Sequence, residues 1–176
     1  GKACYIPIGH NSKKSIDKEI VLKKLKPLLE DPSIKKIGQN IKFDFIVFFK
    51  HGINMTSMED TMLMSYVLDA GKNRHNMDTL SEIHLNHKTI SFKDLVGTGK
   101  KEINFSEVDV EKAKDYAAED ADITFRLYKK FQKSLKDEKM INIYEIFEKP
   151  LLKILAFMEI EEVKIDLSLI HISEPT

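Results

Sequence analysis

The sequence predicts an α/β protein, because short runs of apolar and β-branched residues alternate with longer segments whose apolar residues recur at helical spacing. The opening run "ACYIPI" alternates in character and predicts a strand, in which Cys4 would be a small buried residue. Residues 34–37 predict a second, buried strand, and residues 57–60 a turn or a short strand. No internal repeat or low-complexity tract interrupts this order.

Segments with apolar residues three or four positions apart predict the helices. The predicted helices cover residues 16–30, "IKFDFIVFFKHG", "TMLMSYVLD", residues 77–85, "SFKDLVG" and residues 110–136. Asp31 and Pro32 close the first of them, and we expect the Asp60 side chain to cap the helix that follows it. After Glu138 the composition changes to an amphipathic helix that we expect Pro150 to interrupt.

The composition excludes several classes of protein. No apolar run approaches the roughly 20 residues that a membrane span needs, so we expect no membrane partner. The 28 basic and 28 acidic residues balance, so a polyanion would have to be held by a local patch. Such a patch lies between residues 72 and 101, with six Lys or Arg against three Asp or Glu. The single cysteine agrees with a reducing, cytoplasmic setting.

The segment "KDYAAEDADITFRLYKKF" concentrates charge beside an aromatic hydroxyl, with a tyrosine and four carboxylates in eight residues. On a helix, Tyr116 and Asp120 are four positions apart and therefore lie on one face. We expect the other three acids, Asp115, Glu119 and Asp122, to be mostly solvated. Only Asp120 would then point inward with the tyrosine.

Asp44 lies in a segment otherwise filled with apolar residues, where an acid needs a partner. Two aspartates from separate helices, together with a phenol, suit one hard cation that prefers oxygen ligands. Simpler readings remain open for each residue. Asp120 alone fits a surface carboxylate, Tyr116 a core aromatic with its hydroxyl at the rim, and Asn40 the cap of the helix that contains Asp44.

Two motifs carry a resemblance to a known family. "GQNIKFD" is similar to the second motif of the proofreading-type exonucleases with a DEDD active site, and "YAAED" matches their third motif in its tyrosine form, Y-x-x-x-D. "RHNMDTLSEIHLNHKTISF" and "YAAEDADIT" resemble the 3′-to-5′ exonuclease domain of bacterial DNA polymerase I, and the likeness runs over residues 3–166. It implies a ribonuclease-H-like fold with a mixed sheet flanked by helices, in a monomeric, cytoplasmic and nucleoid-associated bacterial protein.

The resemblance also implies a chemistry, in which two divalent cations, Mg²⁺ or Mn²⁺, serve hydrolysis of the 3′-terminal phosphodiester of single-stranded DNA in replication and repair. By motif match, Asp44 and Asp120 would be metal ligands, and Tyr116 would orient or help deprotonate the attacking water. The positions that match substrate contacts are Gln39, Asn40, Arg74 and Phe92. From the sequence itself, Phe92 fits a core residue of a short helix equally well, and Arg74 a plain surface charge.

The family's first motif, D-x-E on the opening strand, does not precede "YIPIGH", which resembles a later strand. We therefore expect residues 1–146 to be an exonuclease domain incomplete at its N-terminus, 147–166 the start of the polymerase domain of the same parent chain, and 167–176 a non-native read-through tail. Two carboxylates hold two cations poorly, so the chain alone should be nearly inactive. The alternatives are a stand-alone DEDD-type DNA or RNA 3′ exonuclease and a catalytically inactive, exonuclease-like scaffold.

Overall fold

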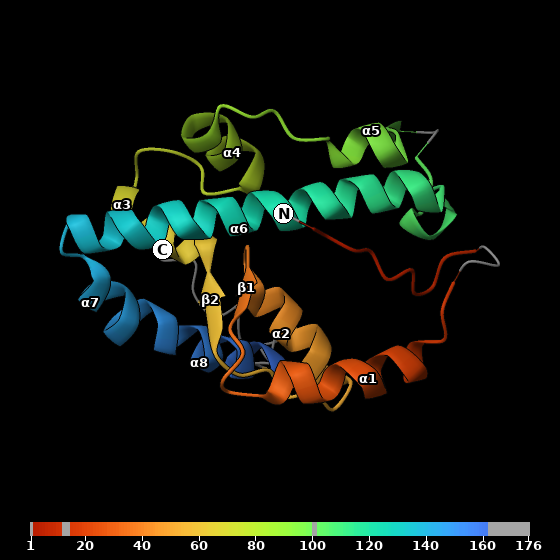
Figure 1. Ribbon diagram of the computed structural model, residues 1–176, viewed down its shortest axis with the longest axis horizontal. Coiled ribbons are helices and arrows are strands. Elements are labelled where there is room, and N and C mark those ends of the chain that lie inside the picture. The colour runs from red at the N-terminus through yellow and green to blue at the C-terminus, as the bar shows by residue number, and fades with distance from the viewer. Residues whose placement is uncertain (1, 12–14, 100–101, 162–176) are drawn as a thin grey trace, which may run out of the picture.

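The computed structural model describes residues 2–11, 15–99 and 102–161, so the tail expected at 167–176 lies outside the described residues. These ranges form a mostly helical protein with a small parallel sheet (Figure 1). The elements in chain order are α1 (Lys18–Glu30), β1 (Lys36–Gly38), α2 (Ile41–Lys50), β2 (Met58–Asp60), α3 (Thr61–Asp69), α4 (Met77–Leu85), α5 (Phe92–Val96), the 3₁₀ turn η2 (Phe105–Glu107), α6 (Val110–Asp137), α7 (Ile141–Ile143), the π-helical turn η3 (Tyr144–Glu148) and α8 (Lys149–Ile160).

Helix α6 is the axis of the molecule. Figure 1 shows it crossing the whole view, with α4 and α5 on one side and β1, β2, α1, α2 and α8 on the other. Its 28 residues begin at a cap, since the Asp109 side chain accepts hydrogen bonds from the N–H groups of Glu111 and Lys112. The apolar stripe of α6 is buried in the main core, whose buried residues are Met64, Leu80, Ile123, Leu127, Tyr128, Phe131, Leu135 and Tyr144.

The sheet of the described residues has two parallel strands, β1 and β2, paired with Ile37 opposite Glu59 and Gly38 opposite Asp60. Strand β2 is buried along its whole length, although two of its residues are acids. The strands predicted at 34–37 and 57–60 are therefore confirmed with small shifts of their bounds. Strand β2 leads directly to α3, and Gln39 and Asn40 join β1 to α2, so the two helices begin after neighbouring strand ends.

The opening segment differs from the prediction, because residues 2–11 form no strand and Cys4 is exposed. An alternating run becomes a strand only where a neighbouring strand supplies partners for its backbone groups. In the part of the chain that is described, β1 and β2 pair with each other, and the opening segment instead meets the turn η2, where the Asn11 N–H donates to the Ser106 carbonyl at 2.9 Å.

The interruption expected at Pro150 is also absent, because η3 and α8 follow one another and Pro150 lies in the first turn of α8. A proline inside a helix removes one N–H donor and its ring crowds the carbonyl four residues earlier. The π-helical turn resolves this locally, since the Lys149 N–H donates to the carbonyl of Tyr144, five residues before it. Helix α8 then packs on α2, where Phe157 meets the rings of Phe45 and Phe49 edge to face.

Asp60 links β2 to α2, α3 and η3 through hydrogen bonds. Its side chain, 1% exposed, caps α3 as predicted by accepting from the Met62 N–H at 2.8 Å. The same carboxylate also accepts from the N–H groups of Asn40 and Ile41, each at 3.0 Å, and so caps α2 as well. The backbone N–H of Asp60 donates to the Tyr144 hydroxyl at 3.0 Å, which links β2 to η3.

We expect Asp60→Ala to lower the free energy of unfolding by about 3 kcal/mol, because it leaves the first N–H groups of two helices buried without an acceptor. Urea unfolding followed by circular dichroism measures this loss. The matched control is Asp17→Ala, which removes a single exposed cap bond at the start of α1 and should cost about 1 kcal/mol. Equal losses in the two variants would contradict the double-cap role of Asp60.

Candidate active site

Helix α6 places Tyr116 and Asp120 one turn apart, close enough for each side chain to shift the pKa of the other. The shared face predicted from their spacing is therefore confirmed. Burial raises the pKa of Asp120 to about 6, against the opposing effect of the Tyr116 hydrogen bond, and the charges of Glu119 and Asp78 raise it further. Burial likewise raises the pKa of Tyr116 to about 12, with the charge of Asp120 adding to the effect.

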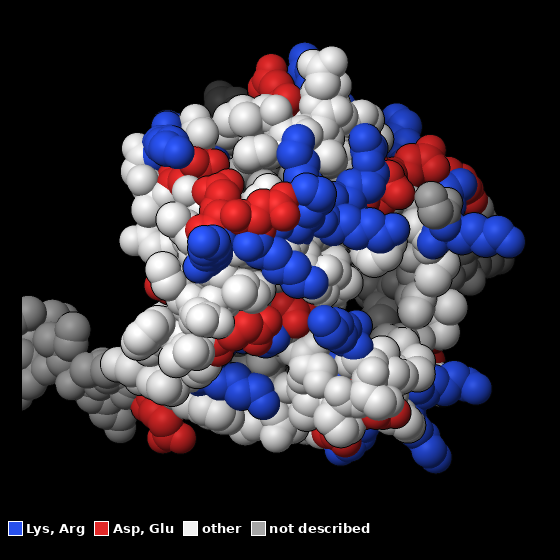
Figure 2. Space-filling view, turned by 60° about the vertical axis from the view of Figure 1, so that its left-hand side comes forward, with Lys and Arg blue, Asp and Glu red and all other residues white. Residues whose placement is uncertain are grey.

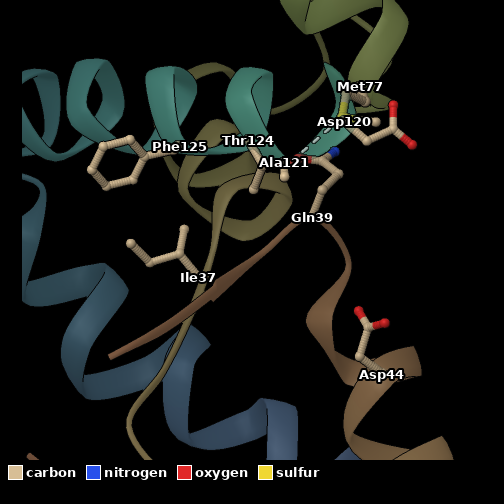
Figure 3. A pocket seen from close by; sticks show the side chains of 8 residues that line it. All are labelled: Ile37, Gln39, Asp44, Met77, Asp120, Ala121, Thr124 and Phe125. Atoms are coloured by element: carbon tan, nitrogen blue, oxygen red, sulfur yellow. Dashed lines mark hydrogen bonds between the residues drawn. The ribbon is translucent and has the colours of Figure 1, made fainter. Parts of the chain in front are cut away.

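A cavity of about 470 Å³ opens beside Asp120, between α6, α2 and the end of β1. Figure 3 shows Asp44 on α2 and Asp120 on α6 at two sides of this space. The residues that line the cavity are Ile37, Gln39, Asp44, Met77, Asp120, Ala121, Thr124 and Phe125. The two aspartates that sequence reasoning selected, from helices far apart in the chain, thus border one cavity.

The two carboxylates have different charged neighbours. The pKa of Asp44 is raised by loss of hydration against the surrounding protein, and secondarily by the charge of Asp60. Glu119 and Asp78 are the charges that act on Asp120. Within the described residues, no three acidic, histidine or cysteine side chains gather closely enough to hold a metal ion. Asp44 and Asp120 supply the oxygen donors that a hard divalent cation prefers, but fewer of them than such a cation requires.

Gln39 and Asn40 join β1 to α2, and Gln39 lines the cavity. The Gln39 amide is engaged at both ends, because its Nε2 donates to the His75 carbonyl at 2.7 Å and its Oε1 accepts from the Thr61 hydroxyl. Asn40 stands at the start of α2 with a left-handed φ of 58°, and its side chain makes no capping bond. The capping role considered for Asn40 belongs to Asp60, which leaves the Asn40 side chain exposed.

Arg74 lies exposed in the connection between α3 and α4. The next residue, His75, fixes this connection to the site, because its carbonyl accepts from Gln39 and its Nδ1 is 2.9 Å from the Ser65 hydroxyl. The structure therefore brings the Arg74 segment next to Gln39, although 35 positions separate the two in the sequence.

Phe92 begins α5 and is 48% exposed. The alternative considered from the sequence, that Phe92 is a core residue of a short helix, is therefore wrong. The Phe92 ring lies 6.1 Å from the ring of Tyr116 and stacks at 5.9 Å on the ring of Phe105. An exposed aromatic face thus stands directly beside the Tyr116 and Asp120 pair. The structure brings Phe92 to the site from a separate short helix.

Glu119 is an exception to the expectation that Asp115, Glu119 and Asp122 are mostly solvated. Its side chain is 18% exposed, whereas that of Asp115 is 67% exposed. Glu119 accepts from His87 Nε2 at 2.7 Å and from the Ile90 N–H at 2.6 Å. Sequence reasoning missed this residue because both partners come from a segment about 30 positions away, and no local pattern marks the pairing.

The surface carries no field of one sign on the side turned forward in Figure 2, where basic side chains alternate with acidic ones. This mixture matches the balanced total of 28 basic and 28 acidic residues. Among the residues that the structure describes, no helix combines the length and the apolar character needed to cross a membrane.

Comparison with known proteins identifies the family to which this chain belongs. Residues 1–136 match the family of 3′-5′ exonucleases. The chain is 41% identical over 176 residues to a DNA polymerase I of Rhizobium leguminosarum, covering 94% of this chain and 17% of the relative. It is 38% identical over 179 residues to that of Pseudomonas aeruginosa, covering 98% and 20%. The chain thus spans about a fifth or less of these relatives, and it belongs to the 3′-5′ exonuclease family, as a domain homologous to part of DNA polymerase I.

Proposed function

We propose that this chain is the proofreading module of a DNA polymerase I, which removes nucleotides from the 3′ end of single-stranded DNA during replication and repair. One observation carries the proposal. Asp44 and Asp120 border a single cavity, with Tyr116 one turn before Asp120 on α6, in a chain of the 3′-5′ exonuclease family. The reaction is attack of a water molecule on the terminal phosphorus, with departure of the 3′ oxygen of the preceding nucleotide.

Asp44 and Asp120 would hold divalent cations of the Mg²⁺ or Mn²⁺ type, and other oxygen donors have to complete the site. Such cations, when bound, favour ionisation of the attacking water and neutralise charge on the leaving oxygen. The side chains of the protein would orient the attacking water. Tyr116, one turn before Asp120 on α6, would orient this water toward the phosphorus.

Single-stranded DNA needs aromatic faces and cations rather than base-specific contacts. The exposed ring of Phe92 offers a stacking face beside Tyr116, and Arg74 offers a charge for a phosphate. Asn40 contributes an exposed amide at the start of α2. Gln39 would act by holding the Arg74 segment, since both ends of its amide already bind protein groups.

The proposal extends to the surroundings of the domain. A mixed, ribonuclease-H-like sheet would add strands to the β1 and β2 pair, and the polymerase domain of the same parent chain would be its main protein partner. The large unmatched share of each relative supports this partner over a stand-alone DNA or RNA exonuclease. We further propose a monomeric parent protein in the bacterial cytoplasm, associated with the nucleoid.

A second candidate is an exonuclease-like scaffold without catalysis. It is favoured by one observation, that no three acidic, histidine or cysteine side chains meet at a metal-binding distance in the described ranges 2–11, 15–99 and 102–161. The presence of Asp44 and Asp120 at one cavity, with Tyr116 one turn before Asp120 on α6, favours the enzyme instead. Metal binding by the two aspartates separates the candidates.

We expect Asp44→Asn and Asp120→Asn each to weaken Mn²⁺ binding by about tenfold, because an amide is a poorer ligand than a carboxylate for a hard cation. Water-proton relaxation during a Mn²⁺ titration measures the affinity. Asp115→Asn removes the same charge from an exposed position of α6 and serves as the control, with no change expected. Unchanged affinity in all three variants would favour the scaffold.

The 176-residue chain alone should release nucleotides from a 3′-labelled oligonucleotide in Mg²⁺ at a rate below detection, because two carboxylates neutralise too little charge. Gel analysis of the product ladder measures cleavage. The same assay on the product of the complete parent gene should show Mg²⁺-dependent cleavage that Asp120→Ala abolishes. Digestion by the 176-residue chain that also requires Asp120 would show that its metal site is already sufficient.

Phe92→Ala should weaken binding of an oligo(dT) strand by about tenfold, since stacking of a base on an aromatic ring contributes about 1–3 kcal/mol. Fluorescence anisotropy in EDTA measures binding without cleavage. Phe147→Ala is the matched control, because Phe147 is an exposed phenylalanine of η3, on the other side of α6, and its loss should leave the affinity unchanged. An equal loss in both variants would argue against a stacking site at Phe92.

A further inference from the structure

The connection between α4 and α5, residues 86–91, is tied to α6 by one carboxylate. Both oxygens of Glu119 are used, one accepting from His87 Nε2 at 2.7 Å and the other from the Ile90 N–H at 2.6 Å. A backbone N–H and a ring N–H are thus bound by the same side chain, from two positions of one short connection. The connection cannot shift along α6 without breaking at least one of these bonds.

Helix α4 holds the other side of the same connection. The hydroxyl of Ser81, which is fully buried, donates to the His87 carbonyl at 2.9 Å. The Thr89 hydroxyl donates to Asp78 at 2.6 Å. These bonds attach the connection to α4, and the Glu119 bonds attach it to α6. Glu119 is therefore the link between this connection and the helix that carries the proposed site.

This link contributes to the position of Phe92. Ile90, bound to Glu119, lies two residues before Phe92, and Ser91 between them caps α5 through the Lys93 N–H. On α6, Glu119 directly precedes Asp120 and lies three positions after Tyr116, so the anchor and the proposed catalytic pair occupy one helical turn. The ring of Phe92 stands 6.1 Å from that of Tyr116. The Glu119 link acts there together with the packing of Val96 against Ala113 and the stacking of Phe92 on Phe105.

We propose that Glu119 is a positioning residue, which clamps residues 87–90 to α6 and thereby holds the Phe92 ring against Tyr116 for stacking on single-stranded DNA. The inference rests on the proposed function of the site, and it adds a residue that touches neither DNA nor metal. It explains why Glu119, an acid, lies beside a proposed DNA-binding surface, where an unpaired carboxylate would repel phosphates.

The sign of one mutational effect separates the clamp from a simple charge effect. Removing an acid near DNA normally strengthens binding, because repulsion of the phosphates decreases. Asp115→Ala, which removes an exposed acid one turn earlier on α6, should accordingly leave binding unchanged or tighten it. Glu119→Ala should weaken oligo(dT) binding by about fivefold to tenfold, because Phe92 loses its fixed position. Glu119→Gln keeps an acceptor for the Ile90 N–H and should stay within about threefold of the unaltered chain.

A double-mutant cycle tests whether Glu119 acts through Phe92. Oligo(dT) binding is measured in EDTA by fluorescence anisotropy for Glu119→Ala, Phe92→Ala and the combination, so that bound metal cannot contribute. We expect the combination to bind no more than about twofold more weakly than Phe92→Ala alone, since a clamp has nothing left to position. Losses that multiply in the combined variant, or tighter binding by Glu119→Ala, would overturn the proposal.

Hydrogen exchange of the Ile90 amide gives a readout that does not depend on DNA. Its protection should fall by at least about tenfold in Glu119→Ala and stay unchanged in Asp115→Ala, because Glu119 is the acceptor of this N–H. Unaltered protection in Glu119→Ala would overturn the clamp itself. If protection is lost but the unaltered chain and Phe92→Ala bind DNA equally poorly, the proposed function of the site fails while the clamp stands.

Discussion

A buried carboxylate on the second strand is the constraint on which the rest of the structure depends. Asp60 lies where the chain leaves β2, and it accepts hydrogen bonds from the starts of α2 and α3. Because these two helices begin on one acceptor, Gln39, which lines the cavity, has a fixed place beside the start of α3. Asp44, in the first turns of α2, takes its position from the same bonds. One side chain thus sets one wall of the candidate active site.

Helix α6 supplies the opposite wall, and one of its turns has two separate tasks. Asp120 borders the cavity with Tyr116 one turn before it, while Glu119 binds the connection before α5. The high density of acids in this turn has a structural explanation for two of them. Asp120 lies one turn after the Tyr116 phenol, and burial raises its pKa. Glu119 accepts hydrogen bonds from the Ile90 backbone N–H and from the His87 ring. Asp115 remains the solvated charge that the sequence suggested for it.

The sequence predicted features that depend on neighbouring residues and missed those that depend on distant ones. The helices, the Asp60 cap of α3 and the shared face of Tyr116 and Asp120 follow from spacings of four residues or fewer, and all are confirmed. The Asp60 cap of α2 joins residues about 20 positions apart, and no local signal announces it. The strand expected around Cys4 was wrong because alternation does not supply a partner strand. The meeting of Asp44 with Asp120 at one cavity was suggested by motif resemblance, and spacing alone could not predict it.

The π-helical turn η3 has a further consequence, for the tolerance of the domain to changes in length. The turn accommodates an extra residue, and each residue added to or removed from a helix rotates the remainder of that helix by about 100°. A deletion there would turn Phe157 away from Phe45 and Phe49. Related chains can therefore vary the exposed side chains of this turn, such as Ile146 and Phe147, far more freely than its number of residues.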